Sequence, residues 1–492
     1  MALALILSPL LFAAIAALIP SNGARPILLP IAAAFHLAMT ILVVARPDLA
    51  SWPVLDFGPE SWLGIDAPGK LVLFVVSVLF FFCSIYSIGY LRYREERSNR
   101  VFVSCLLVFL SVIGLVAFSR HLGLMWVAIE ATTLSTAPLV YFNHSRKSIE
   151  ATWKYLLVGS VGIALALFGT FFLAYSAEPA GLKPSMMMGD LVGMASSLSK
   201  PWLRAAFILL LVGYGTKIGL APMHTWKPDA YGEAPGLVGA VFAGGVTSVA
   251  FLAFLRVYRV CVAAGESQYI SRVLLAMGLF SMAVAGLFMV GQRDFKRSLA
   301  YSSDEHMGIL IVGLGIGGPA LYGTMLHVAT NGLTKGVLFL SAGNIHRAYA
   351  SKSTDDVHGA MRRLPLSGAL FLAGFLAITG SPPFGPFVSE FSILAGAFDS
   401  RLFLVGALFL LFLFVVFLGM GKTVLKVILG RPPAEVMVAD GAEAQSAPYR
   451  DGLLTVAPVF ALMALVLLLG ICVPAPLDSL VREAASSLEA GL

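Results

Sequence analysis

The sequence predicts an all-α, polytopic membrane protein. Of its 492 residues, 58% are hydrophobic and only 12% are charged, and the mean hydropathy is +0.88. Soluble domains contain about 25% charged residues. Apolar stretches of about 20 residues, long enough to cross a bilayer as a helix, recur along the whole chain. We therefore expect transmembrane helices throughout and no separate soluble domain.

The apolar stretches predict about fourteen transmembrane helices. Turn residues separate them, such as the run Pro20–Gly23 between the first two. In chain order, the helices are expected to begin near Ala2, Ile27, Lys70, Val101, Leu122, Ala151, Leu203, Gly236, Arg272, Ser302, Leu321, Leu366, Leu402 and Leu453.

Glycine and proline interrupt two of these helices, the seventh at Gly215–Pro222 and the twelfth at Gly380–Pro386. Proline removes a backbone donor, and irregular backbone at membrane depth is tolerated where protein or water satisfies it. The interruptions lie an odd number of helices apart, so the two segments run in opposite directions, as in inverted repeats. We expect three N-terminal helices in residues 1–100, a first five-helix repeat in 101–260 and a second in 261–430. Residues 431–492 are expected to form a connector loop from Arg431 to Arg450, a last helix and a short tail.

Lysine and arginine gather in one set of alternate loops, most densely at Arg92, Arg94, Arg97 and Arg100. The positive-inside rule places these loops in the cytoplasm and both termini on the opposite side. The same bias accounts for most of the formal net charge of +6, so we expect no nucleic-acid partner.

The four cysteines are isolated and form no C-x-x-C motif. We therefore expect no iron–sulfur cluster, other cofactor or metal ion on this chain.

Four ionisable residues, Glu130, Lys217, Lys335 and Glu390, lie inside otherwise apolar spans. A charge at the centre of a bilayer costs about 2.5 to 3.5 kcal/mol on insertion scales, so such residues usually face a partner or a hydrated path. Glu130 lies about 12 Å along its helix from the expected start at Leu122, close to the middle of the membrane. These four residues predict a proton or ion relay.

A polar stripe supports this interpretation, because His327, Asn331 and Lys335 recur at four-residue intervals and share one face of a helix. A single histidine in a helix is usually a satisfied core group, but a stripe that ends in lysine favours a hydrated path. Lys217 has a simpler alternative, since a lysine near a helix end can extend to the interface. The apolar stretch resumes through Met223 and Trp226, which favours a position inside the membrane.

Several segments resemble the antiporter-like, proton-conducting membrane subunits of respiratory complex I, Mrp-type cation/proton antiporters and membrane-bound hydrogenases. The resemblance covers nearly the whole chain. Ile129–Thr136 (IEATTLST) and Ser381–Phe391 (SPPFGPFVSEF) are most similar to the F-type subunit of hydrogenase-4. The segments that carry the resemblance are Trp126–Thr136, Lys217–Pro235, Asp294–Gly308, Leu326–Gly343 and Gly380–Leu394.

The resemblance implies that Glu130 is the partner of Lys217, that Lys335 is the central lysine of the second half, and that Glu390 is the ionisable group of the broken twelfth helix. It also implies supporting roles for other polar positions. Two positions depart from the pattern: Ser248 stands where many relatives have a lysine, and Asn331 where hydrogenase-type relatives often have a histidine. Waters would have to bridge these gaps. The supporting positions are His224, Asp229, His306 and His327.

The resemblance implies a proton-translocating subunit of a redox-driven complex in the inner (cytoplasmic) membrane, with other membrane subunits as partners. The redox centres would lie on those partners, so this chain would be a non-catalytic subunit of an oxidoreductase. Two alternatives stay open. The chain could belong to an Mrp-type antiporter, with Na⁺ as a possible second ion, or it could be a scaffold of the same fold that does not conduct.

Overall fold

The computed structural model describes residues 1–46, 61–94, 97–432 and 449–489. Within these ranges the regular structure is helical, and β structure is limited to isolated bridges such as that of Leu63 with Ser119. The longer helices are α1 (Ala2–Leu18), α2 (Leu28–Ala45), α4 (Ala67–Arg92), α5 (Arg100–Phe118), α6 (Leu122–Val140), α7 (Arg146–Tyr175), α9 (Lys200–Ile218), α12 (Thr247–Ala263), α13 (Ser267–Val290), α14 (Phe295–Ile316), α15 (Leu321–Tyr349), α17 (Pro365–Ile378), α18 (Gly385–Asp399), α19 (Phe403–Ile428), α21 (Leu453–Ile471) and α22 (Ala475–Glu489).

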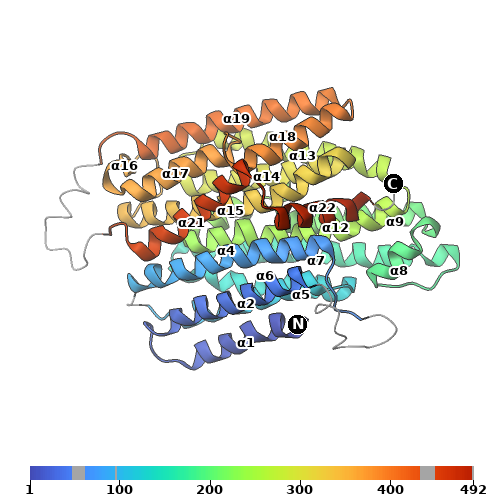
Figure 1. The fold of residues 1–492 in the computed structure, drawn as a ribbon, viewed down its shortest axis with the longest axis horizontal. Helices are drawn as coiled ribbons and strands as arrows, with labels where there is room; N and C mark the ends of the chain where they lie inside the picture. Colours follow the sequence, from blue (N-terminus) through green and yellow to red (C-terminus); the bar gives the residue numbers. More distant parts are fainter. Residues whose placement is uncertain (47–60, 95–96, 433–448, 490–492) are drawn as a thin grey trace.

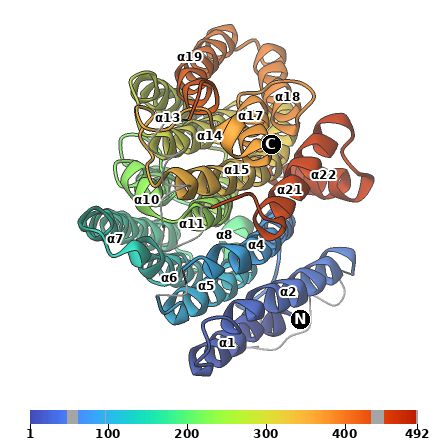
Figure 2. The ribbon, with the colours of Figure 1, turned by 90° about the vertical axis from the view of Figure 1, so that its left-hand side faces the viewer.

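The long helices lie side by side along the long axis of the molecule (Figure 1). Viewed from the end, α1 and α2 form one edge of the bundle and α13 and α19 lie at the opposite edge (Figure 2). Helix α15 packs against α4, α14, α17, α18 and α21, and most of its residues are buried. The side chains of α15 therefore face protein on all sides.

The expected all-α, polytopic architecture is confirmed. Most helices begin at or within about three residues of the expected start, but α7 and α13 begin five residues earlier than expected, and α14 begins seven residues before Ser302. By length and composition, nine of the described helical runs could cross a membrane. The total of fourteen spans, the inverted repeats and the four regions stay predictions. Most of the expected connector, residues 433–448, lies outside the described residues.

The short tail expected after the last span contains a helix, α22, that the sequence analysis did not predict. Its apolar residues Leu480, Val481, Ala484 and Leu488 are buried, and the helix packs against α4, α12 and α15. At its first turn, the Tyr322 hydroxyl of α15 donates a hydrogen bond of 2.6 Å to Asp478. One amphipathic face thus fixes this segment to the bundle.

Both expected helix interruptions are present. Helix α9 ends at Ile218, Gly219 follows with a φ of +89°, and the short helix α10 (Lys227–Glu233) begins after a turn. Helix α17 ends at Ile378, and α18 begins at Gly385. The first interruption starts later than the expected Gly215, because the missing N–H of Pro222 frees the carbonyl four residues earlier, which belongs to Ile218.

A π-helical turn, η5 (Phe242–Val246), joins α11 (Gly236–Val241) to α12 in one continuous helical run. Here the run passes close to α15, since a Cβ at Gly244 would lie 3.0 Å from the carbonyl oxygen of Gly332.

Further along, Arg256 of α12 forms a 2.9 Å ion pair with Asp66, which also caps the N-terminus of α4. The guanidinium donates to the carbonyls of Val116 and Ala117 as well, at 2.8 and 2.7 Å.

Glycines bring α7 and α9 into backbone contact. A Cβ at Gly213 of α9 would lie 2.6 Å from the amide nitrogen of Ala166, and a Cβ at Gly162 of α7 would lie 2.6 Å from the Cβ of Thr216. Real Cβ atoms do not approach backbone this closely. The two helices can therefore hold Lys217, one turn beyond Gly213, firmly against α7.

We expect Gly213→Ala to destabilise the protein by about 1–3 kcal/mol, because the added methyl group overpacks a contact with rigid backbone. The thermal unfolding midpoint of the purified protein in detergent measures this effect. Gly291→Ala is the matched control, since a Cβ at Gly291 would meet nothing within 4 Å. Equal midpoints for the two variants would contradict the close packing of α7 on α9.

Candidate functional site

Lys217 is fully buried at the C-terminal end of α9. Its ammonium group donates hydrogen bonds to the hydroxyl of Thr133 and, at 3.4 Å, to the hydroxyl of Tyr155. It also lies 4.8 Å from the centre of the Tyr155 ring, within cation–π range. The Thr133 hydroxyl in turn donates to Oε2 of Glu130 at 3.0 Å. Glu130 and Lys217 are thus linked through Thr133.

Glu130 is only partly buried, although the sequence places it near mid-membrane. Val127 and Leu134, which share its face of α6, are 52% and 63% exposed. Ser160 of α7, also exposed, donates to Oε1 of Glu130 at 3.5 Å. Helix α6 begins at Leu122 as expected, but its rotation directs this carboxylate toward the outside of the chain.

Lys227, the first residue of α10, is fully buried. Its ammonium group forms a 3.1 Å ion pair with Asp304 of α14 and donates to the carbonyl of Ile218 at 2.9 Å. That carbonyl is the one freed by the interruption of α9. A Cβ at Gly219 would lie 2.6 Å from Nζ of Lys227, so the chain has room for the ammonium only because residue 219 is glycine.

Lys335 lies inside the bundle on α15, as expected for an intramembrane lysine. Its ammonium group is fully buried and donates to the hydroxyl of Ser302 at 2.7 Å. Lys335 also interacts electrostatically with Asp304, Glu305 and Glu390. Asp304 and Glu305 are site residues that the sequence reasoning missed, although Asp304, Glu305 and His306 are consecutive polar residues in a mostly buried helix.

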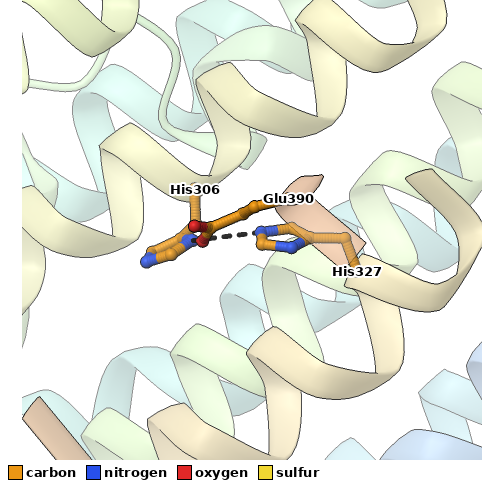
Figure 3. Close-up of side chains that lie close together, drawn as sticks. All are labelled: His306, His327 and Glu390. Carbon is orange, nitrogen blue, oxygen red and sulfur yellow. Dashed lines mark hydrogen bonds and ion pairs between the residues drawn. The ribbon is translucent and has the colours of Figure 1, made fainter. Parts of the chain in front are cut away.

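Two histidines and a carboxylate from three different helices converge in the interior of the bundle (Figure 3). Nδ1 of His306 (α14) lies 3.0 Å from Nε2 of His327 (α15), and Oε1 of Glu390 (α18) lies 3.8 Å from Nδ1 of His306. Nδ1 of His327 is hydrogen-bonded to the hydroxyl of Ser389 at 2.9 Å, a contact that sequence reasoning also missed. All three side chains are buried.

Three of the expected site residues form none of these hydrogen bonds or ion pairs, although the charge of Lys227 acts on His224. The ring of His224 is near the rings of Phe288 and Tyr301. Asp229 is partly exposed and forms ion pairs with Lys154 and Arg297 at the rim of α10. The amide oxygen of Asn331 is buried with no hydrogen-bond partner among the described residues. The supporting roles of these residues therefore stay predictions.

A family model described as "NADH:quinone oxidoreductase/Mrp antiporter, TM" matches residues 119–420. A hydrogenase-4 component F homolog from Methylacidiphilum infernorum is 38% identical over 350 residues, which are 69% of this chain and 73% of the relative. The NADH-quinone oxidoreductase subunit N of Desulforudis audaxviator is 31% identical over 361 residues, 72% of this chain and 70% of the relative.

Solved structures show the same fold. A chain of respiratory complex I from Thermus thermophilus superposes with a TM-score of 0.75 at 27% identity, covering 96% of this chain and 97% of the other. A chain of the Mrp complex from Dietzia sp. gives a TM-score of 0.86 at 22% identity, covering 99% and 97%.

These relatives are components of multi-subunit membrane complexes. The resemblance inferred from the sequence, including the similarity to hydrogenase-4 component F, is confirmed. The chain is an integral membrane protein with several spans, and it belongs to the family of NADH:quinone oxidoreductase/Mrp antiporter transmembrane subunits.

Proposed function

We propose that this chain translocates protons as the antiporter-like membrane subunit of a redox-driven complex of the hydrogenase-4 or complex I type. One observation carries the proposal, namely a row of ionisable groups through the interior of the bundle. In order from α6 to α18 its members are Glu130, Lys217, Lys227, Asp304, Lys335, Glu305, His306, His327 and Glu390.

The first part of the row works as a charge-sensitive pair. Removing an ammonium from water costs free energy, and a nearby carboxylate offsets part of this cost. Glu130 acts on Lys217 through the Thr133 hydroxyl, so a change of charge at Glu130 changes the free energy of holding a proton on Lys217. A neighbouring subunit can approach Glu130, because this carboxylate faces outward.

The second part of the row begins with the Lys227–Asp304 pair, and Lys227 also donates to the carbonyl of Ile218, the residue after Lys217. Lys227 follows the interruption of α9 and Asp304 lies on α14, so this pair joins a helix of the expected first repeat to one of the second. The charge on Asp304 acts next on Lys335, which in turn interacts with Glu390. Protons leave or enter at His306, His327 and Glu390 beside the interruption between α17 and α18, with waters bridging the gaps at Ser248 and Asn331.

In this proposal, partner subunits carry out the redox chemistry and the transported ion is H⁺. The chain lies in the cytoplasmic membrane, with both termini on the non-cytoplasmic side. The similarity to the hydrogenase-4 component F homolog favours the redox-driven complex over an Mrp-type antiporter.

We expect the purified complex in proteoliposomes to acidify or alkalinise the lumen when its electron donor is oxidised, with the same amplitude in Na⁺-free and Na⁺-containing buffer. A pH-sensitive dye in the lumen measures this. The single chain should insert into liposomes but show no redox-driven signal. Autonomous Na⁺/H⁺ exchange by the single chain would favour the antiporter instead, and electron transfer without any dye response in the intact complex would favour the scaffold.

A further inference from the structure

We propose that His306, His327 and Glu390 form an intramembrane binding site for a divalent transition-metal ion, Zn²⁺ being the best match. One ligand atom from each residue can be chosen so that all lie within 4.8 Å of one another. The set of two imidazoles and one carboxylate is one that zinc accepts, with a further position left for water. The binding itself does not depend on the proposed proton transport.

The distances in the cluster are close to those that zinc requires. Two ligand atoms about 2.0–2.1 Å from a tetrahedral ion are about 3.3 Å apart. The facing nitrogens of His306 and His327 are 3.0 Å apart, and Oε1 of Glu390 is 3.8 Å from Nδ1 of His306. All three ligand atoms lie within 4.8 Å of one another, so the side chains would have to move closer together to complete the coordination.

The outward ring nitrogens of both histidines face groups that can orient them. Nδ1 of His327 is hydrogen-bonded to Ser389, and Nε2 of His306 lies 3.6 Å from Oε2 of Glu305. Histidines that bind metal ions usually donate their second N–H to a carboxylate, carbonyl or water, which fixes the tautomer. Here both inner nitrogens, Nδ1 of His306 and Nε2 of His327, are the ones directed at the common centre (Figure 3).

The third ligand is free to bind. Oε1 of Glu390 is buried without a hydrogen-bond partner among the described residues, and the residue is 4% exposed. Its other oxygen lies against the helix interruption, where a Cβ at Gly380 would be only 2.3 Å away. The carboxyl groups of Glu390 and Glu305 lie beside His306, and the ammonium groups of Lys335 and Lys227 also act on this histidine.

Bound Zn²⁺ would occupy the two ring nitrogens between which His306 and His327 now share a hydrogen bond. It would thereby interrupt the row of ionisable groups and inhibit proton transfer. This consequence rests on the proposed function, whereas metal binding does not.

The test is a Zn²⁺ titration of the purified full-length chain in detergent after treatment with a chelator. We expect about one high-affinity zinc ion per chain. In His327→Gln the affinity for zinc should be at least about a hundredfold weaker, because loss of a ligand costs more than the 10–100-fold typical of losing a residue that only orients a ligand. His36→Gln is the matched control, because His36 is also a buried helical histidine and bonds Ser77 at 3.0 Å, outside this cluster. Parent-like affinity in His327→Gln, or an equal loss in both variants, would overturn the site.

Zinc-edge X-ray absorption of the loaded parent protein gives a test that needs no variant. We expect a shell of nitrogen and oxygen at about 2.0 Å with two imidazoles. A spectrum with sulfur at about 2.3 Å, or without two imidazoles, would refute the assignment.

Discussion

Lys217→Met should reduce redox-driven proton pumping by about a hundredfold or more, the lower range of what positioned proton-transfer groups contribute. Methionine fills a similar volume but cannot carry a proton, so the hydrogen-bonded link to Glu130 through Thr133 would lose the ammonium that donates to Thr133. The measurement is the initial rate of the luminal dye response in proteoliposomes, divided by the rate of electron transfer.

Two further variants separate proton transfer from folding. Glu130→Gln should cause a comparable loss, since it removes the carboxylate that acts on Lys217. Lys422→Ala, at an exposed lysine of α19, should pump like the parent. All variants should insert and assemble at parent levels. Normal pumping by Lys217→Met in assembled complex would exclude Lys217 from the relay.

Breaking the Lys227–Asp304 pair should have the largest effect on stability. Removing one partner of a buried ion pair typically costs about 3–5 kcal/mol, because the other charge stays buried and unpaired. We therefore expect Lys227→Met and Asp304→Leu each to lower the free energy of unfolding by this amount. Denaturant unfolding in mixed micelles, followed by tryptophan fluorescence, would report it.

The double variant Lys227→Met/Asp304→Leu should recover most of the lost stability, because two apolar side chains can replace a buried ion pair at little cost. Its pumping should stay absent, which would distinguish the transport role from the structural one. Lys154→Met provides the comparison at a half-exposed ion pair with Asp229, where a change of at most about 1 kcal/mol is expected. Additive losses in the double variant would show that the two side chains do not form one unit.

Much of the fold follows from local sequence features. The change from turn residues to apolar residues marks where helices start. Glycine and proline mark the two helix interruptions. The burial of Lys217, Lys335 and Glu390 inside the bundle was also predictable, because a charge within a long apolar stretch has no route to water along its own helix.

Features that depend on how helices are rotated and packed were not predictable in this way. Lys227 lies just after an interruption, where sequence allows either a loop or the interior, and only packing against α14 decides between them. The outward direction of Glu130 depends on the rotation of α6. Helix α22 was missed because it is amphipathic, and its charges hide the apolar face when hydropathy is averaged.

The metal site was likewise not expected, because His306, His327 and Glu390 are far apart in sequence and come from three helices. No short motif joins them. These three side chains converge because α14, α15 and α18 pack together in the folded protein.

The π-helical turn at Phe242–Val246 sets the angular register of the helix that follows it. Helix α12 is apolar and buried around most of its circumference, so hydrophobicity alone selects no face for it. A π turn closes its hydrogen bonds one residue later than an α turn. If the same five residues closed as α turns instead, everything downstream would rotate by about 100°, carrying Arg256 away from Asp66 and from the α5 carbonyls. The length of this one turn, rather than the composition of α12, thus fixes which way its guanidinium points.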